Sequence, residues 1–149
     1  MPQPVLYVED EPDDVFFMQR AFATAQVVHP LHIAGDGQVA IEYLSGLKGE
    51  EGAATKPLPS LVLLDLNLPR VHGLEVLRWI RSQAQLRCLP VAVLSSSLER
   101  SDIEAAYTFG ANSYLVKPSA FEDLKDLARI IAEYWLQRNQ VASASEAGT

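Results

Sequence analysis

The chain has 149 residues, of which 48% are hydrophobic and 21% are charged, and these values are typical of one soluble globular domain. The net charge of −7 argues against a protein that itself binds DNA or RNA, because such proteins need a basic surface. No apolar run is long enough to span a membrane and the N-terminus lacks the basic start of a signal peptide, so we expect a cytoplasmic protein with no membrane partner.

The first half of the chain alternates short apolar runs with segments of helical periodicity. Residues 5–8 are predicted to form a strand that ends at the acidic run 9–11, and Pro12 suits the first turn of a following helix. A second, weaker strand is expected at residues 31–34, again followed by a helix. Residues 45–60 are rich in glycine, alanine, proline and charge, which predicts an exposed, mobile loop.

A third strand is predicted at residues 61–64, four consecutive large apolar residues of the kind found in a buried strand of a parallel sheet. This run ends on a carboxylate, Asp65. An isolated aspartate after a strand most often caps a turn or the next helix. Asp65 is not isolated in this way, because the first strand also ends in carboxylates, Glu9 and Asp10, and a later strand ends in a lysine.

The second half of the chain continues the alternation of strand and helix. Gly73 precedes a third helix, and Cys88, which lies among apolar residues before a fourth strand at 90–94, is predicted to be a buried, unreactive thiol. A short helix is expected to stop at Gly110, where a left-handed backbone suits glycine. The fifth strand is predicted at residues 113–116.

The last helix has the clearest helical periodicity in the chain and runs as far as Trp135. Ser119 and Glu122 are spaced as in a capping box, which would start this helix. The polar residues beyond it cannot bury enough apolar surface to fold. We therefore expect one domain at residues 1–140 and a disordered C-terminal tail at 141–149.

Five strands that alternate with five helices predict an α/β fold with a doubly wound, five-stranded parallel sheet. Right-handed crossovers leave few topologies, and the flavodoxin-like strand order 2-1-3-4-5 places the first and third strands side by side. In that order Asp10 and Asp65 converge at the carboxyl edge of the sheet, where ligands bind in such folds.

The polar residues expected at this edge suit phosphoryl transfer. Three carboxylates, Glu9, Asp10 and Asp65, would repel one another unless a cation lay between them, and a few oxygen ligands with retained waters suit Mg²⁺. Ser95 and Lys117 end the fourth and fifth strands at the same edge. Mg²⁺ and the lysine would neutralise phosphoryl oxygens, and a carboxylate can act as the nucleophile.

The chain closely resembles the receiver domain of two-component response regulators, over residues 5–139. The motifs that carry this resemblance are Val8-Glu9-Asp10, the turn from Asp65 to Pro69, Ser95, and Leu115-Val116-Lys117-Pro118. The resemblance implies a phosphorylation-dependent switch that accepts its phosphoryl group from a sensor histidine kinase. Because the residues after the last helix are few and polar, we expect no output domain.

The resemblance also assigns the metal ligands. Asp65 would be the phosphoacceptor, and Asp10 would bind Mg²⁺ together with Asp65 and the backbone carbonyl of Asn67. Glu9 would act mostly through a water. Lys117 would pair with Asp65 at rest and with the phosphoryl group afterwards, and its bond to Pro118 is expected to be cis.

The same resemblance assigns a switch and a path for hydrolysis. Ser95 would donate its hydroxyl to the phosphoryl group, and Ser96 would offer its backbone N–H. Tyr114 would swing inward as Ser95 moves. Asn67 and Ser97, each two residues beyond a site residue, would border the path of the attacking water and tune hydrolysis.

A narrower resemblance, to small regulators partnered with phytochrome-type histidine kinases, rests on the turn 67–69, the run 110–114 and the ending 134–136.

With no second domain expected, output would leave through the face built from the fourth helix, fifth strand and fifth helix. This face carries more aromatic residues than a core needs, so we expect a homodimer there, although the same residues could simply cover the sheet. The aromatic residues are Tyr107, Phe109, Tyr134 and Trp135.

Two other readings of the site remain open at this point. A Mg²⁺-dependent phosphatase with an aspartyl nucleophile would need a second carboxylate two residues after Asp65, but that position is Asn67. A degenerate receiver that acts only as a binding module is disfavoured because all five site residues are present. His72 is read as a solvated loop residue, and His29 and His32 are assigned no role.

Overall fold

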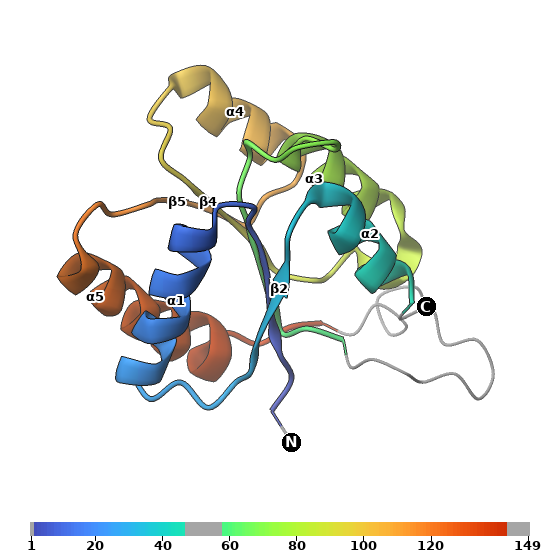
Figure 1. Ribbon diagram of the computed structural model, residues 1–149. Coiled ribbons are helices and arrows are strands. Elements are labelled where there is room, and N and C mark those ends of the chain that lie inside the picture. Colours follow the sequence, from blue (N-terminus) through green and yellow to red (C-terminus); the bar gives the residue numbers. More distant parts are fainter. Residues whose placement is uncertain (1, 47–57, 143–149) are drawn as a thin grey trace.

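The computed structural model describes residues 2–46 and 58–142 as a sheet with helices on both faces (Figure 1). The predicted loop at 45–60 and tail at 141–149 fall largely outside these described residues. In chain order the elements are β1 Val5–Val8, α1 Pro12–Thr24, β2 Leu31–Ala34, α2 Gly37–Ser45, β3 Leu61–Leu64, α3 Gly73–Ser82, the 3₁₀ turn η1 Ala84–Leu86, β4 Val91–Ser95, α4 Arg100–Thr108, β5 Ser113–Val116, α5 Phe121–Ile131 and its π-helical continuation η2 Ala132–Arg138.

The sheet is parallel and has the strand order β2-β1-β3-β4-β5, which confirms the predicted flavodoxin-like topology. β1 and β3 are neighbours, with Val8 opposite Leu64. The residues that follow these two, Glu9 and Asp65, therefore leave the sheet side by side. At the other side of β3, Ser95 at the end of β4 lies opposite Val116 of β5, so Lys117 leaves the sheet at the same edge.

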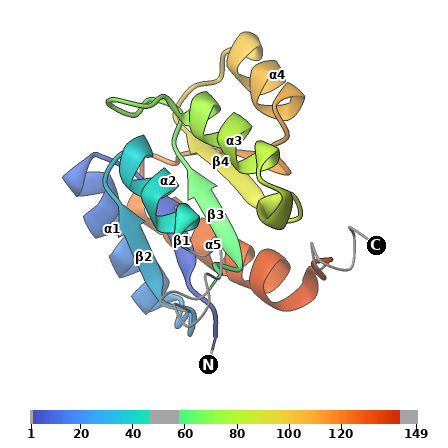
Figure 2. The ribbon, with the colours of Figure 1, turned by 90° about the vertical axis from the view of Figure 1, so that its right-hand side faces the viewer.

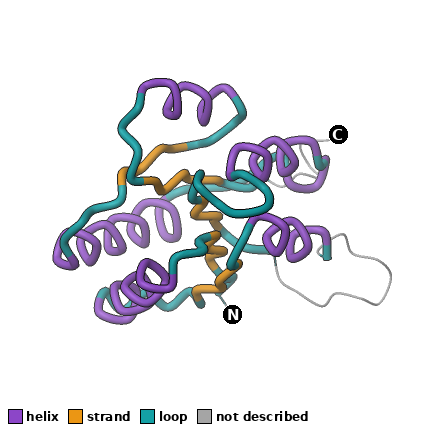
Figure 3. The backbone as a smooth tube through the Cα atoms, turned by 45° about the horizontal axis from the view of Figure 1, so that its top comes forward, coloured by secondary structure: helices purple, strands orange, loops and turns teal. Residues whose placement is uncertain are grey.

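Two hydrophobic layers hold the helices against the sheet, because alternate residues of each strand point to opposite faces. Val5 and Tyr7 of β1 pack with α1 and α5 on one face, whereas Leu6 and Val8 pack with α2 and α3 on the other. Figures 2 and 3 show the strands between these two helical layers. α4 is attached through a smaller cluster that includes Ala106 and Tyr114. None of the helices among the described residues is long and apolar enough to cross a membrane.

Arg81, a residue that the sequence pattern did not single out, joins α3 to the loops beside it. Its guanidinium donates to the carbonyls of Gly110 at 2.9 Å and Leu89 at 2.8 Å, and to Asn112 Oδ1 at 2.9 Å. Gly110 has the expected positive φ of 105°, and a Cβ there would lie 2.8 Å from the Arg81 side chain. The loop between α4 and β5 is therefore fixed against the end of α3, and burial lowers the pKa of Arg81.

Three local expectations were wrong. The predicted capping box does not form: α5 begins at Phe121 after an extended Ala120, and no side chain caps it. The bond between Lys117 and Pro118 is trans, as are all peptide bonds between described residues, and trans is the lower-energy form of an ordinary X-Pro bond. Cys88 is half-buried rather than buried, because it lines a surface pocket beside Trp135.

Candidate functional site

Three carboxylates converge at the carboxyl edge of the sheet, as the sequence predicted. Glu9 and Asp10 follow β1 and Asp65 follows β3, and one oxygen of each side chain lies within 4.8 Å of the others. Glu9 is 1% exposed and Asp65 is 5% exposed, so two of the three are shielded from bulk water. The cluster exists because neighbouring parallel strands end at the same level, which the register of β1 and β3 provides.

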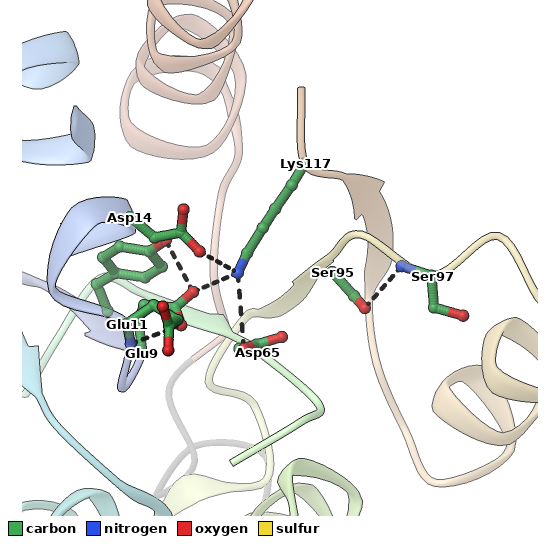
Figure 4. Close-up of polar contacts among 8 residues, drawn as sticks. Glu9, Glu11, Asp14, Asp65, Ser95, Ser97 and Lys117 are labelled. Carbon is green, nitrogen blue, oxygen red and sulfur yellow. Dashed lines mark hydrogen bonds and ion pairs between the residues drawn. The ribbon is translucent and has the colours of Figure 1, made fainter. Parts of the chain in front are cut away.

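Lys117 extends from the end of β5 into this cluster (Figure 4). Its ammonium donates to Glu9 Oε1 at 2.5 Å and to Asp14 Oδ2 at 2.9 Å, and lies 3.6 Å from Asp65 Oδ2. The expected pairing with Asp65 is thus present only as a longer ion pair. Asp14, on the first turn of α1, is a partner of Lys117 that sequence reasoning missed, because its position there also suits a helix N-terminus.

Burial and mutual charge perturb these groups together. Burial raises the pKa of Glu9, and the charge of Asp65 raises it further although Lys117 opposes both. Burial also raises the pKa of Asp65, against the opposing effects of Lys117 and of the backbone N–H of Asn67. For Lys117 burial alone would lower the pKa, but its hydrogen bonds to Glu9 and Asp14 outweigh this and raise it. Burial therefore disfavours the simultaneous ionisation of Glu9 and Asp65.

This donor set fits a hard divalent cation. The ligands are carboxylate oxygens, which Mg²⁺ and Mn²⁺ prefer, and they are few enough for several waters to remain on the ion. A cation would also stabilise the ionised forms whose pKa values burial now raises. Tyr7 of β1 contacts the cluster as well, because its buried hydroxyl donates to Glu9 Oε1 at 3.2 Å.

Gly73, the first residue of α3, fixes the backbone beneath Asp65. Its N–H donates to the carbonyl of Leu66 at 2.9 Å. A Cβ at this position would lie 2.3 Å from the carbonyl oxygen of Asp65 and 2.6 Å from the Cα of Leu66. Only glycine permits this approach without displacing the Asp65 backbone. His72 precedes it as an exposed residue, and its Nδ1 accepts the N–H of Leu74, so it caps α3.

Ser95 is fully buried at the end of β4, and its Oγ accepts the N–H of Ser97 at 3.1 Å. The Ser97 hydroxyl donates to Asp102 of α4 at 2.6 Å, and the Ser97 carbonyl accepts the Tyr114 hydroxyl at 2.9 Å. The predicted residues Ser95, Ser97 and Tyr114 thus belong to one chain of hydrogen bonds that ends on α4. Asp102 was not predicted, because nothing in its local sequence distinguishes it from other acidic residues on exposed helices.

Of the remaining residues considered from the sequence, Asn67 and Ser96 follow strands at this edge, whereas the two other histidines do not. The side chains of Asn67 and Ser96 are exposed, on the loops after β3 and β4. His29 Nδ1 lies 2.7 Å from the Gln3 carbonyl, and the His32 ring packs on Tyr43, so both histidines have structural contacts far from the carboxylates.

The predicted aromatic face is only partly formed. Tyr107 is 50% exposed and Tyr134 is 52% exposed, whereas Trp135 packs partly into the core. Phe109 does not belong to this face, because it packs against the α2–α3 layer and under the guanidinium of Arg78.

Comparison with known proteins identifies the class to which this fold and site belong. The sequence model of the response regulator receiver domain matches residues 5–129. The chain therefore belongs to the response regulator receiver family, whose members act as phosphoacceptor switches in two-component systems and work with histidine kinases.

Particular relatives cover nearly the whole chain. The probable methanogenesis regulatory protein FilR2 of Methanothrix harundinacea is 41% identical over 93% of this chain and 87% of its own length. The response regulator Rcp1 of Synechocystis is 36% identical over 91% of this chain and 90% of its own length, and its Mn²⁺-bound structure superposes with a TM-score of 0.80 at 34% identity over 95% of this chain and 100% of that one. The phosphorylated cyanobacterial phytochrome response regulator RcpA superposes with a TM-score of 0.82 at 34% identity, over 96% of this chain and 100% of that one.

Proposed function

We propose that Asp65 is the phosphoacceptor of this chain. A carboxylate oxygen of Asp65 forms a bond to phosphorus while the P–N bond to the kinase histidine breaks, and the electron pair of that bond returns to the imidazole. The observation that carries this proposal is the convergence of Glu9, Asp10 and Asp65 with the ammonium of Lys117 at one edge of the sheet.

Mg²⁺ is the proposed cofactor. Asp10, Asp65 and the backbone carbonyl of Asn67 would hold it, with Glu9 acting through a water, and the bound ion would supply positive charge to the phosphoryl oxygens. The Mn²⁺-bound structure of the relative Rcp1 supports a divalent site in this fold. Lys117 would bind one phosphoryl oxygen, the hydroxyl of Ser95 a second, and the backbone N–H of Ser96 would contribute from the β4–α4 loop.

The phosphatase reading receives no support. The chain matches the receiver family, and the residue two positions after Asp65 is the amide Asn67, which cannot shuttle a proton. We propose instead that the chain catalyses only its own phosphorylation from small donors and its own dephosphorylation, with Asn67 and Ser97 tuning the second step.

Incubation with acetyl phosphate and Mg²⁺, followed by mass spectrometry of the intact protein, tests this function. We expect a gain of about 80 Da, the mass of one phosphoryl group. The gain should disappear in Asp65→Asn and in wild type treated with EDTA. Asp36→Asn is a matched control, because Asp36 is an aspartate of a neighbouring loop that caps α2 instead. Undiminished labelling of Asp65→Asn at another residue would contradict the assignment.

We propose a phytochrome-type histidine kinase as the phosphoryl donor, in the cytoplasm. The support is the likeness, over 96% of this chain, to the cyanobacterial phytochrome response regulator RcpA. Phosphotransfer from a panel of autophosphorylated sensor kinases tests this, and we expect the fastest transfer from a phytochrome-type member. Equal or faster transfer from unrelated kinases would contradict it.

Two further proposals concern organisation. We propose a receiver domain at residues 1–140, with residues 141–149 as a tail that contributes nothing to phosphorylation. We also propose that the chain forms a homodimer through α4, β5 and α5, and that it binds no nucleic acid itself. The net charge of −7 supports the last point, and the exposed Tyr107 and Tyr134 support the dimer.

A further inference from the structure

We propose that Asp14 is a positioning residue that restrains the Lys117 ammonium away from Asp65 and thereby slows phosphorylation. The proposal rests on the function proposed above for Asp65. Its starting observation is that Lys117 donates to Asp14 at 2.9 Å while it lies 3.6 Å from Asp65, beyond hydrogen-bond range. Figure 4 shows the ammonium between the two carboxylates.

Asp14 differs from the other partners of Lys117 because it is not one of the carboxylates placed to bind a cation. Glu9 and Asp65 belong to the carboxylate cluster that suits a divalent cation, whereas Asp14 lies outside that cluster. A bound cation would draw the charge of Glu9 and Asp65 to itself. Asp14 would then remain as the carboxylate that competes with the reacting centre for the lysine.

The burial of the pair makes this competition effective. The Lys117 side chain is only 16% exposed and that of Asp14 is 42% exposed, so water screens their attraction less than it screens an ion pair on the open surface. The backbone positions of Asp14 and Lys117 are also held by packed secondary structure. Asp14 stands on the first turn of α1, which packs on α5 through Phe22 and Ile131, and Lys117 follows directly on β5.

Asp13 provides a matched control for the alternative that Asp14 merely favours the N-terminus of α1. Both aspartates lie in the first turn of the same helix, where negative charge is stabilising. Asp13 is exposed, and its side chain makes no hydrogen bond or ion pair within residues 2–46 and 58–142. Asp13→Asn and Asp14→Asn therefore remove the same charge from the same turn, but only Asp14→Asn takes away a hydrogen-bond partner of Lys117.

The test measures the rate of labelling by acetyl phosphate and Mg²⁺ in the full chain. Asp14→Asn should label roughly two- to fivefold faster than wild type, the effect of losing one partly exposed ion pair. Asp13→Asn should change the labelling rate less than about 1.5-fold, because water and salt screen the charge of an exposed carboxylate from the reacting centre. Asp14→Glu, which restores the carboxylate on a longer side chain, should return the rate toward wild type.

Side-chain ¹⁵N NMR of Lys117 provides a second measurement that does not depend on phosphorylation. We expect its ammonium signal to shift in Asp14→Asn and to stay unchanged in Asp13→Asn. Equal or slower labelling of Asp14→Asn relative to Asp13→Asn, or an unshifted Lys117 signal, would overturn the proposal. If no variant gained mass, the proposed function of Asp65 would fail instead, and the NMR signal would still decide whether Asp14 holds Lys117.

Discussion

At the scale of single residues, the site combines groups that burial makes unfavourable to ionise. Glu9 and Asp65 are almost fully buried and close enough to repel, and burial raises the pKa of both. The positive charge of Lys117 offsets part of the cost of ionising these carboxyls, but it is shared among Glu9, Asp14 and Asp65. The fold therefore tolerates its acidic cluster at a cost, and a cation bound in the cluster would stabilise the folded state.

We predict that Asp65→Asn stabilises the metal-free protein at pH 7. A buried carboxyl whose folded-state pKa is raised contributes stability below its unfolded pKa and loses it as the pH rises through the folded pKa. The neutral amide avoids this loss, and we expect a rise in melting temperature of about 2–4 °C in EDTA.

The advantage of Asp65→Asn should shrink as the pH falls toward the unfolded-state range, about 4 for aspartate. Mg²⁺ should raise the melting temperature of wild type and leave that of the variant almost unchanged. Thermal melts of both proteins at two pH values, with EDTA and with Mg²⁺, measure this. A variant that melts below wild type at pH 7 in EDTA would show that Asp65 is a net stabiliser.

Hydrolysis of the phosphorylated protein should respond to Asn67. Its side chain is exposed beside Asp65, so a larger apolar side chain fits there without disturbing the core and hinders the approach of water. We expect Asn67→Leu to lengthen the phosphoryl lifetime roughly threefold or more. Loss of the mass gain over time, after removal of acetyl phosphate, measures the lifetime.

Ser97 should act on hydrolysis less directly, because its hydroxyl is donated to Asp102 and its N–H to Ser95. Ser97→Ala should therefore affect the conformation of the β4–α4 loop as well as the lifetime. Lifetimes equal to wild type for several substitutions at both positions would show that neither residue borders the path of the water.

At the level of helices and strands, two polar connections tie the helices to the sheet, one at its carboxyl edge and one at its amino edge. One runs from Ser95 through Ser97 to Asp102 and Tyr114, and so from β4 to α4 and β5. The other is Arg81, which holds the α4–β5 loop against the end of α3. A change at Ser95 can therefore reach α4 while Arg81 keeps the opposite end of α4 fixed.

We predict that Arg81→Lys destabilises the fold. The lysine ammonium cannot reproduce the planar fork with which Arg81 reaches Gly110, Leu89 and Asn112, so carbonyl acceptors that are partly buried lose their partners. The expected loss in the free energy of unfolding is about 1.5–3 kcal/mol, typical of hydrogen bonds to a charged group. Urea denaturation measures it.

Arg78→Lys is the matched control for Arg81→Lys. Arg78 lies on the same helix, is exposed, and stacks 5.3 Å above the Phe109 ring. Its replacement should cost less than about 1 kcal/mol. Equal losses for the two variants would mean that the hydrogen bonds of Arg81 contribute little.

At the scale of the whole molecule, signalling depends on a surface that changes when the carboxyl edge is phosphorylated. Tyr114 connects the carboxyl edge to this surface. Its hydroxyl donates to the loop after Ser95, and its ring packs beside Ala106 of α4. The charge-assisted hydrogen bonds that Ser95 and Lys117 would donate to a phosphoryl group would be worth roughly 1.5–3 kcal/mol each, enough to shift a two-state equilibrium by about one or two decades.

We predict that this shift changes self-association through α4, β5 and α5. Sedimentation velocity with and without beryllium fluoride, which mimics the phosphoryl group, should show a change in dimer affinity. Tyr107→Ser and Tyr134→Ser should weaken the dimer, because both side chains are half exposed on this face. Phe16→Ser is the control, since Phe16 is 51% exposed on α1 instead. A monomer at all concentrations in both states would leave this surface to other partners.

The strands and the main residues of the site can be read from local patterns in the sequence, and those patterns leave few strand orders open. The four residues before Asp65 and the four before Glu9 are apolar runs typical of buried parallel strands, and such strands end at one edge. Short-range patterns of this kind are readable because the period of a strand and the residue that ends it are local properties. Asp65, Asp10, Glu9 and Lys117 were predicted on that basis, and the structure brings them together.

The partners of those residues follow from the three-dimensional packing. Asp14 bonds to Lys117 across 103 positions of sequence, and Arg81 reaches Asn112 across 31, and no local pattern encodes either contact. Phe109 likewise packs against the α2–α3 layer, although the sequence predicted it on the face of α4, β5 and α5. Contacts between side chains distant in sequence follow from how the helices pack on the sheet. That packing depends on the shape of the whole core, which no single segment contains.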